Sequence, residues 1–193
     1  MALPDRHGHW PLVSAATAGP ASALVLARRE TFLADGAWVR WLPLPALLLH
    51  QTEEWVWPGG FLPWFNREVM GSGEDEYPIT RRDGLIINVG MGWVVALAAG
   101  AGGESRPGIA SAQLAMLLGN SGLHLAEVAR TRTYNPGSLT AAALFLPLGI
   151  AGMRQLRRQE RREGRGREVA VGAALGAASA AALMAVMRRR MRG

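Results

Sequence analysis

Residues 85–103 read LIINVGMGWVVALAAGAGG, a continuous stretch in which no side chain is charged. A helix needs about 20 predominantly apolar residues to cross the hydrocarbon core of a bilayer. A helix on the surface of a soluble protein would instead place charged residues between its apolar ones. The stretch therefore predicts a transmembrane helix, and it indicates that the chain is an integral membrane protein.

Further apolar segments lie on both sides of this one. They predict an all-α fold, an integral membrane helical bundle with four to five transmembrane helices, whose other segments are 41–57, 107–129, about 138–156 and an Ala/Gly-rich run at 169–187. The stretch 12–27 is also apolar, but Gly19 and Pro20 interrupt it, so we expect either an extra span or an extension along the surface. Residues 1–11 lack a clear n-region and no A-x-A site follows, so we expect no cleaved signal peptide.

The composition divides the chain into three parts. Residues 1–37 form an N-terminal extension, 38–156 a four-helix membrane domain, and 157–193 an Arg-rich loop followed by the Ala/Gly-rich helix. Within that last helix, Gly172 and Gly176 form a small-x-x-x-small pair, a pattern that lets helices approach closely in lipid. This pair is a candidate contact face for an oligomer.

The charges favour a membrane over nucleic acid as the partner. All 21 basic residues are Arg, and they gather at the ends of apolar segments, as the flanks of membrane helices do. A cytoplasmic N-terminus places most of them inside, including the run from Arg154 to Arg167, so we expect that orientation. If 169–187 also crosses, the Arg residues of the tail lie outside, which fits poorly. The absence of Cys excludes disulfides and thiolate metal ligands.

Ionisable side chains interrupt two of the predicted spans. In the first span, Glu53 and Glu54 follow His50 at i+3 and i+4, so both carboxylates neighbour the imidazole on a helix. The third span carries a similar face, and the second contributes one amide, at Asn120, His124, Glu127 and Asn88. If the spans alternate in direction, all of these groups lie in one layer near the same membrane face. This spacing predicts a shared site inside the bundle, with His50 and His124 facing each other.

Each of these residues also has an ordinary interpretation. The carboxylates can sit at the headgroup boundary, and Glu127 can pair with Arg130 one turn further on. The imidazoles can be satisfied within the core, and Asn88 and Asn120 can hold helices together by hydrogen bonds. An ionisable group at the centre of a membrane costs about 2.5–3.5 kcal/mol on insertion scales, however. Several such groups in one layer therefore favour a functional site.

An aromatic loop follows the first span. It contains PGGFLPWFN at residues 58–66, in which the Pro and Gly residues prevent a regular helix. Trp and Phe are common at the level of the lipid headgroups. The loop is either an aromatic belt along the membrane surface or a lid over a site that is open to lipid.

Three features in this order resemble a known family. They are the His50–x–x–Glu53–Glu54 motif, the later His124, and Tyr134–Asn135–Pro136–Gly137. Together they are similar to the HXXEE-domain family, which is named for the first motif and also marked by a further His and a Y-x-P-G motif. The resemblance covers roughly residues 38–156 and implies a bacterial membrane protein, so we expect the inner membrane. It implies no reaction, but it adds Tyr134 as a residue whose hydroxyl can reach the site.

The leading hypothesis is a membrane-embedded enzyme that acts on a lipid or isoprenoid-like substrate. In one version, the site residues bind one or two divalent metals, and imidazole with carboxylate suits Zn, Fe or Mn. In the other version, a buried carboxylate acts as a general acid or base with His as its partner. No HExxH, G-x-S-x-G, P-loop or Rossmann motif is present, which argues against the commonest hydrolase and nucleotide-binding classes.

The alternative is a small proton- or ion-coupled transporter, or a lipid-binding membrane subunit without catalysis. Carboxylate and imidazole groups within membrane helices also serve as proton or ion relays. A carrier needs a polar path across the membrane, whereas an enzyme needs a pocket closed at one side.

The spacing also predicts which carboxylates are primary. Glu53 follows His50 by three residues, as Glu127 follows His124. Two equivalent half-sites would make Glu53 and Glu127 the paired ligands. Glu54 would then complete the site or orient His50.

Overall fold

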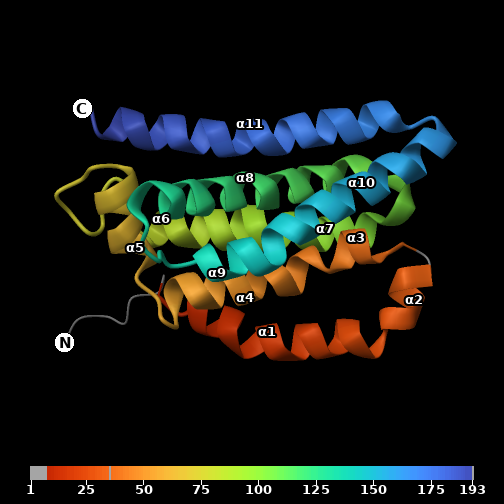
Figure 1. The fold of residues 1–193 in the computed structure, drawn as a ribbon, viewed down its shortest axis with the longest axis horizontal. Coiled ribbons are helices and arrows are strands. Elements are labelled where there is room, and N and C mark those ends of the chain that lie inside the picture. Colours follow the sequence, from red (N-terminus) through yellow and green to blue (C-terminus); the bar gives the residue numbers. More distant parts are fainter. Residues whose placement is uncertain (1–7, 35, 193) are drawn as a thin grey trace.

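The computed structural model describes residues 8–34 and 36–192, and within them it contains helices and no strand. The chain runs back and forth along one long axis (Figure 1). Its longer helices are α1 (Trp10–Ala27), α4 (Pro43–Trp55), α7 (Val94–Gly102), α8 (Pro107–Thr131), α10 (Leu146–Glu163) and α11 (Gly166–Arg190).

Shorter helical pieces extend or connect these. They are α2 (Arg29–Ala34), α3 (Trp38–Trp41), α5 (Phe61–Trp64), α6 (Arg81–Leu85), α9 (Ser138–Thr140) and the 3-10 turn η3 (Gly103–Ser105). Three π-helical segments are η1 (Phe65–Val69), η2 (Ile86–Trp93) and η4 (Ala141–Phe145). Since η2 joins α6 to α7 and η4 joins α9 to α10, each trio forms one long helix.

Within the residues that the structure describes, four helices are long and apolar enough to cross a membrane, as expected of a membrane protein. They are Trp10–Ala27, Arg81–Ser105, Ser138–Glu163 and Gly166–Arg190. Three of them contain the predicted spans 85–103, 138–156 and 169–187. The fourth contains the stretch 12–27, for which the sequence left two interpretations open.

The other two predicted spans are helical, but they are shorter or less apolar than the four helices above. The segment 41–57 is mostly α4, which has 13 residues and is extended at its start by α3. The segment 107–129 lies in α8, whose polar residues, such as Gln113 and His124, lower its hydropathy. Because α8 packs against α7, α10 and α11, its polar residues lie inside the bundle (Figure 1).

The small residues of α11 pack against α8 of the same chain. A Cβ atom on Gly172 would lie 2.0 Å from the carbonyl oxygen of Gly108, and one on Gly176 would lie 2.3 Å from that of Ala112. Close approach without a Cβ is what small residues permit in membrane helices. The Gly172/Gly176 face is therefore already covered, and an oligomer through it would first have to displace α8.

Replacing Gly172 by alanine is expected to lower the free energy of unfolding by about 1–3 kcal/mol, because the new methyl group has no room against Gly108. The matched control is Gly122→Ala in α8, where an added Cβ meets nothing within 4 Å. Thermal unfolding of the two variants in detergent measures the difference. Equal midpoints would contradict the α8–α11 packing.

The two ends of the bundle differ in what they carry. The start of α1 and the end of α11 lie at one end, and the α10–α11 connection lies at the other (Figure 1). If α1 crosses the membrane, the start of α1 is on the opposite side from the run Arg154–Arg167. The N-terminus and the Arg run cannot then both be cytoplasmic. The count of Arg residues on each side places both of them inside only if 12–27 does not cross the membrane.

Candidate metal centre

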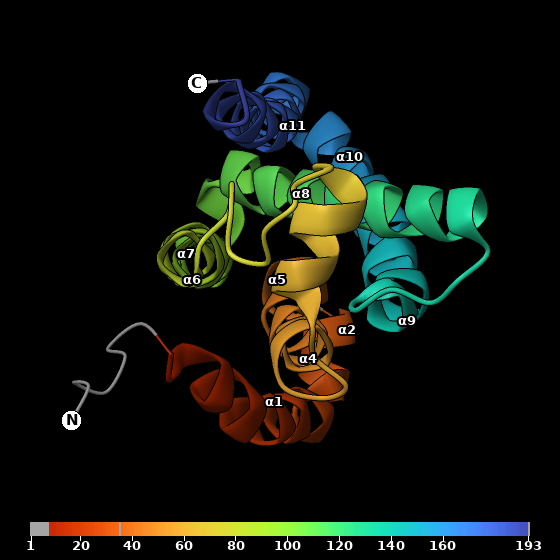
Figure 2. The ribbon, with the colours of Figure 1, turned by 90° about the vertical axis from the view of Figure 1, so that its left-hand side faces the viewer.

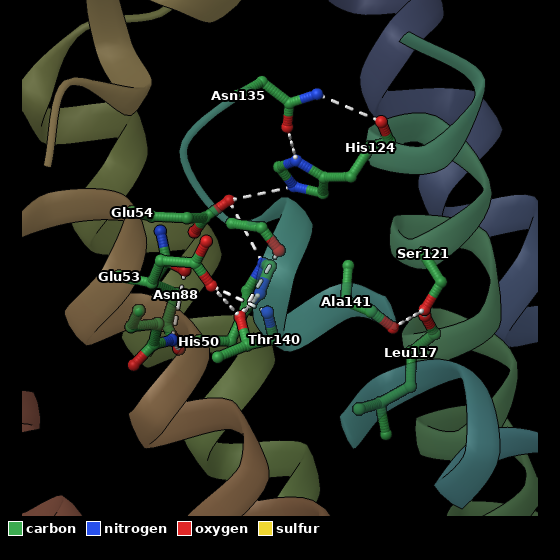
Figure 3. Close-up of polar contacts among 12 residues, drawn as sticks. His50, Glu53, Glu54, Asn88, Leu117, Ser121, His124, Asn135, Thr140 and Ala141 are labelled. Atoms are coloured by element: carbon green, nitrogen blue, oxygen red, sulfur yellow. Dashed lines mark hydrogen bonds and ion pairs between the residues drawn. The ribbon is translucent and has the colours of Figure 1, made fainter. Parts of the chain in front are cut away.

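Two histidines from different helices meet inside the bundle. His50 of α4 and His124 of α8 have their ring centroids 5.1 Å apart, with the planes nearly perpendicular. Both side chains are completely buried. The prediction that these two rings face each other in the interior is confirmed (Figure 3).

One oxygen of Glu54 lies between the two rings. Its Oε1 atom is 3.2 Å from Nε2 of His50 and 3.2 Å from Nε2 of His124. None of these three buried atoms has a hydrogen-bond partner with acceptable geometry among the described residues. All three lie within 4.8 Å of one another, and together they can hold a metal ion.

Asn135 fixes the tautomer of His124. The Nδ2 atom of Asn135 donates to the carbonyl oxygen of His124 at 3.0 Å, which determines how the amide is oriented. Its Oδ1 atom then faces Nδ1 of His124 at 2.7 Å and can only accept (Figure 3). Nδ1 of His124 therefore carries a proton, and when the ring is neutral its Nε2 presents a lone pair.

The hydroxyl group of Thr140 fixes the tautomer of His50. That hydroxyl donates its only proton to Oε2 of Glu53 at 2.5 Å. It must then accept from Nδ1 of His50, which lies 2.8 Å away. The chain from carboxylate to hydroxyl to imidazole leaves a lone pair on Nε2 of His50 as well.

When both rings are neutral, three acceptors converge on one point in the interior. Two imidazole lone pairs and a carboxylate oxygen repel one another unless a proton or a cation lies between them. With metal–ligand bonds of about 2.0–2.1 Å, two ligands of a tetrahedral ion are separated by about 3.3 Å. The two separations around Oε1 of Glu54, 3.2 Å each, are close to that value.

Glu53 caps the helix that begins at α9. Its carboxylate accepts from the backbone N–H groups of Leu139 at 3.1 Å and Thr140 at 2.8 Å. These are donors of the first helical turn, which have no partner inside their own helix. The hydroxyl of Tyr134 also donates to Glu53, at 3.0 Å. Partial burial and this carboxylate raise the pKa of Tyr134 to about 12, so the hydroxyl stays protonated as a donor.

Glu127 lies outside the cluster. It pairs with Arg130, whose Nη2 is 2.7 Å from its Oε2, as in the ordinary interpretation of the sequence. The expected half-site pairing of Glu53 with Glu127 is therefore wrong. The i+3 spacing is shared, but Glu53 turns toward the start of α9 and Glu127 toward Arg130, and the i+4 carboxylate of Glu54 contacts the imidazoles.

Gly137 brings backbone directly against the cluster. A Cβ atom there would lie 2.7 Å from Cε1 of His124, 2.8 Å from Cε1 of His50 and 3.0 Å from Cγ of Glu54. Its φ angle of +99° is also one that L side chains rarely adopt. The segment Tyr134–Gly137 thus makes three contacts with the site. Tyr134 donates to Glu53, Asn135 holds His124, and the backbone of Gly137 lies against both imidazole rings.

The two predicted amides have different roles. Oδ1 of Asn88 accepts from Nε2 of Gln51 at 3.0 Å. Gln51 is completely buried, and its Oε1 accepts from Ser14 of α1 at 2.9 Å and Trp93 of η2 at 2.7 Å. Asn88 therefore belongs to a network that sets the position of α4, and not to the histidine pair. Asn120 lines a pocket beside Glu54.

Sequence reasoning missed several residues of the site as contributors. They are Gln51, Asn135, Gly137 and Thr140. Gln51 had a signal, since it is an amide within an apolar segment. Asn135 and Gly137 belong to the motif that the resemblance rests on, but no spacing rule predicts that Asn135 holds His124 or that Gly137 lies against both His124 and His50. Thr140 had no signal, because Thr is ordinary in membrane helices.

The aromatic loop covers the end of the cluster. Trp64 stacks on His124 with ring centroids 5.2 Å apart and planes at 15°. Phe61 lies 6.2 Å from the same imidazole by ring centroids. Figure 2 looks onto this end of the bundle and shows α5 lying across it. The lid interpretation of this loop matches the geometry, while Trp57, which is 79% exposed, suits the membrane surface.

Comparisons with known proteins agree with the motif. A family model described as "Protein of unknown function with HXXEE motif" matches residues 41–151, more than half of the chain. Searches of curated proteins and of solved structures gave no match. The matched region contains His50, Glu54 and His124 and the segment that anchors them. The chain therefore belongs to the family of proteins with the HXXEE motif.

Proposed function

We propose that this protein is a membrane-embedded enzyme in which His50, Glu54 and His124 bind one divalent metal ion, Zn, Fe or Mn, and that it hydrolyses a lipid or isoprenoid-like substrate. The observation that carries the proposal is the convergence of three buried acceptor atoms without hydrogen-bond partners among the described residues. Asn135 and Thr140 hold both rings in the tautomer that metal ligation through Nε2 requires.

The number of ligands favours catalysis over a structural role. Structural zinc sites are closed by four protein ligands, whereas catalytic sites use three and leave a position for water or substrate. A metal held in this way supplies a Lewis acid and lowers the pKa of its bound water. The residues of the chain orient the two imidazoles, and the Trp64 lid limits the access of bulk water from this end.

The surroundings favour an enzyme over a carrier. On the side toward the α10–α11 connection, the core of the bundle is mostly apolar, with side chains such as Leu114, Phe145 and Leu156, and the polar side chains buried there are isolated ones, among them Gln113. A carrier would need polar groups along that path. An enzyme needs a site closed on one side, which this arrangement supplies.

Metal analysis of the purified full-length chain tests the proposal. Wild-type protein is expected to retain close to one metal ion per chain, and His50→Ala and His124→Ala are each expected to reduce the content at least tenfold. The matched control is His9→Ala, because His9 is exposed near the start of α1. Wild-type protein that takes up no Zn, Fe or Mn would refute the metal site.

We further propose that the Arg-rich end is cytoplasmic in a bacterial inner membrane, following the positive-inside rule. The start of α1 and the metal centre then lie toward the opposite face. Single Cys residues at His9, Gly73 and Arg161, all exposed positions, test this orientation in intact cells. We expect a membrane-impermeant reagent to label the first two and not the third, and the reverse pattern would overturn it.

A further inference from the structure

An open groove of about 790 Å³ lies between α7, α8 and α11, at the end of the bundle that carries the α10–α11 connection (Figure 1). Its lining residues fall into two groups. The charged ones are three Arg residues and one carboxylate, at Arg106, Arg165, Arg167 and Glu168. The apolar ones are Val95, Ile109, Ala112, Val171 and Leu175.

The charged and apolar parts of the groove lie at different depths in a membrane. Arg106 directly follows the candidate span Arg81–Ser105, and Arg167 is the second residue of the candidate span Gly166–Arg190. Both Arg residues therefore belong at the level of the lipid headgroups. Leu175 lies eight residues further along α11 than Arg167, which is about 12 Å. One leaflet of a 30 Å hydrocarbon core is about 15 Å deep, so the apolar part extends through most of a leaflet.

Two of the Arg side chains are available to a ligand. Arg165 pairs with Glu160 and Glu163 of α10. Arg106 and Arg167 are exposed, and neither makes an ion pair within the part of the chain that the structure describes. Glu168 is the one carboxylate among the lining residues. Two guanidinium groups against one carboxylate leave the head of the groove positively charged.

The helix starts that carry these two Arg residues are held together. A Cβ atom on Gly108, two residues after Arg106, would lie 3.2 Å from the carbonyl oxygen of Glu168, the residue after Arg167. The hydroxyl of Ser111 donates to the carbonyl oxygen of Val169 at 2.9 Å, and both residues are buried. Arg106 and Arg167 therefore extend from neighbouring backbone segments whose relative position is fixed.

We infer that this groove binds an anionic glycerophospholipid, with its phosphate at Arg106 and Arg167 and an acyl chain along the apolar wall. Guanidinium groups bind phosphate oxygens through pairs of parallel hydrogen bonds. Basic pockets between membrane helices are suited to anionic headgroups. A zwitterionic lipid brings a cation of its own toward the two Arg residues, so it binds less tightly.

The groove is separate from the candidate metal centre. His124 lies 18 residues beyond Arg106 along α8, which is about 27 Å. The inference therefore does not rest on the proposed enzymatic function. A chain that binds no metal can still bind the lipid, and the reverse also holds.

Native mass spectrometry of the full-length chain in detergent, titrated with phosphatidylglycerol or phosphatidylcholine of the same acyl chains, tests the inference. Each Arg near an anionic headgroup contributes about a fivefold gain in affinity, so wild-type protein is expected to bind the first phosphatidylglycerol about 25-fold more tightly than phosphatidylcholine. Arg106→Gln and Arg167→Gln should each lower this ratio about fivefold. The matched controls are Arg161→Gln and Arg162→Gln, because these exposed residues of α10 are not among the residues that line the groove.

Three results would overturn the inference. Wild-type protein without a preference for phosphatidylglycerol is the first. An equal loss of preference in the α10 variants is the second, since it would assign the effect to the diffuse charge of all the Arg residues. The third concerns the acyl chains: glycerol 3-phosphate, added as a competitor, is expected to displace the lipid at least a hundredfold less well than phosphatidylglycerol itself. Equal displacement would make the groove a site for a soluble phosphate.

Discussion

Replacing Gly137 by alanine is expected to abolish metal binding while the helix content of the protein stays unchanged. The new methyl group would sit less than 3 Å from the rings of His50 and His124. Neither ring can retreat, because Thr140 and Asn135 hold their Nδ1 atoms. A loss of at least a hundredfold in metal affinity is expected, since both imidazoles must turn away from Glu54.

The strain of the backbone must be separated from this steric effect. An alanine at a positive φ angle costs on the order of 1–3 kcal/mol wherever it occurs. Gly71→Ala is the matched control, because Gly71 has a φ of +70° and an added Cβ there meets nothing within 4 Å. We expect both variants to lose stability in thermal unfolding and only Gly137→Ala to lose metal in elemental analysis. Wild-type metal content in Gly137→Ala would contradict the described site.

The meeting of His50 and His124 could be predicted from the sequence, for a simple reason. Helices that alternate in direction across a membrane place residues of equal depth in one layer, and rise per residue gives the depth. Polar side chains in such a layer turn inward, since lipid offers them no partner. The predicted fold class follows from the same physics.

The rotation of each helix could not be predicted in this way. Glu53 and Glu54 are about 100° apart around the axis of α4, so the rotation of α4 about its own axis decides which of them contacts the imidazoles. Contacts on another side of α4 fix this rotation. Gln51 is held by Ser14 of α1 and Trp93 of η2, and neither contact has a signal in the spacing of the motif.

The first helix shows a different limit of sequence reasoning. Gly19 and Pro20 suggested a break in the stretch 12–27, yet α1 is continuous through both. Proline is tolerated in membrane helices where neighbouring groups replace the missing hydrogen bond. Whether 12–27 crosses the membrane decides which side the start of α1 occupies, so this one element changes the predicted topology.

The three carboxylates that the sequence predicts for the site are expected to respond differently to the same change, Glu to Gln. Glu54→Gln should abolish metal binding, because it replaces a charged ligand by a neutral one between the imidazoles. It should not lower the unfolding midpoint, since a buried charge disappears with it. Glu127→Gln should change neither quantity, because Glu127 pairs only with the exposed Arg130.

Glu53→Gln should mainly destabilise the protein and weaken metal binding about tenfold to a hundredfold. The amide nitrogen of Gln can accept nothing, so two donors lose their partner in either orientation: Leu139 and Tyr134 if the nitrogen replaces Oε1, or the backbone and hydroxyl of Thr140 if it replaces Oε2. In the second orientation, the change removes the acceptor that orients the Thr140 hydroxyl toward His50. Unfolding midpoints and metal content of the three variants, measured together, separate a ligand from a residue that positions one. If Glu53→Gln proved worse for metal content than Glu54→Gln at unchanged stability, Glu53 would be the ligand, and the shared oxygen of Glu54 would be a structural contact only.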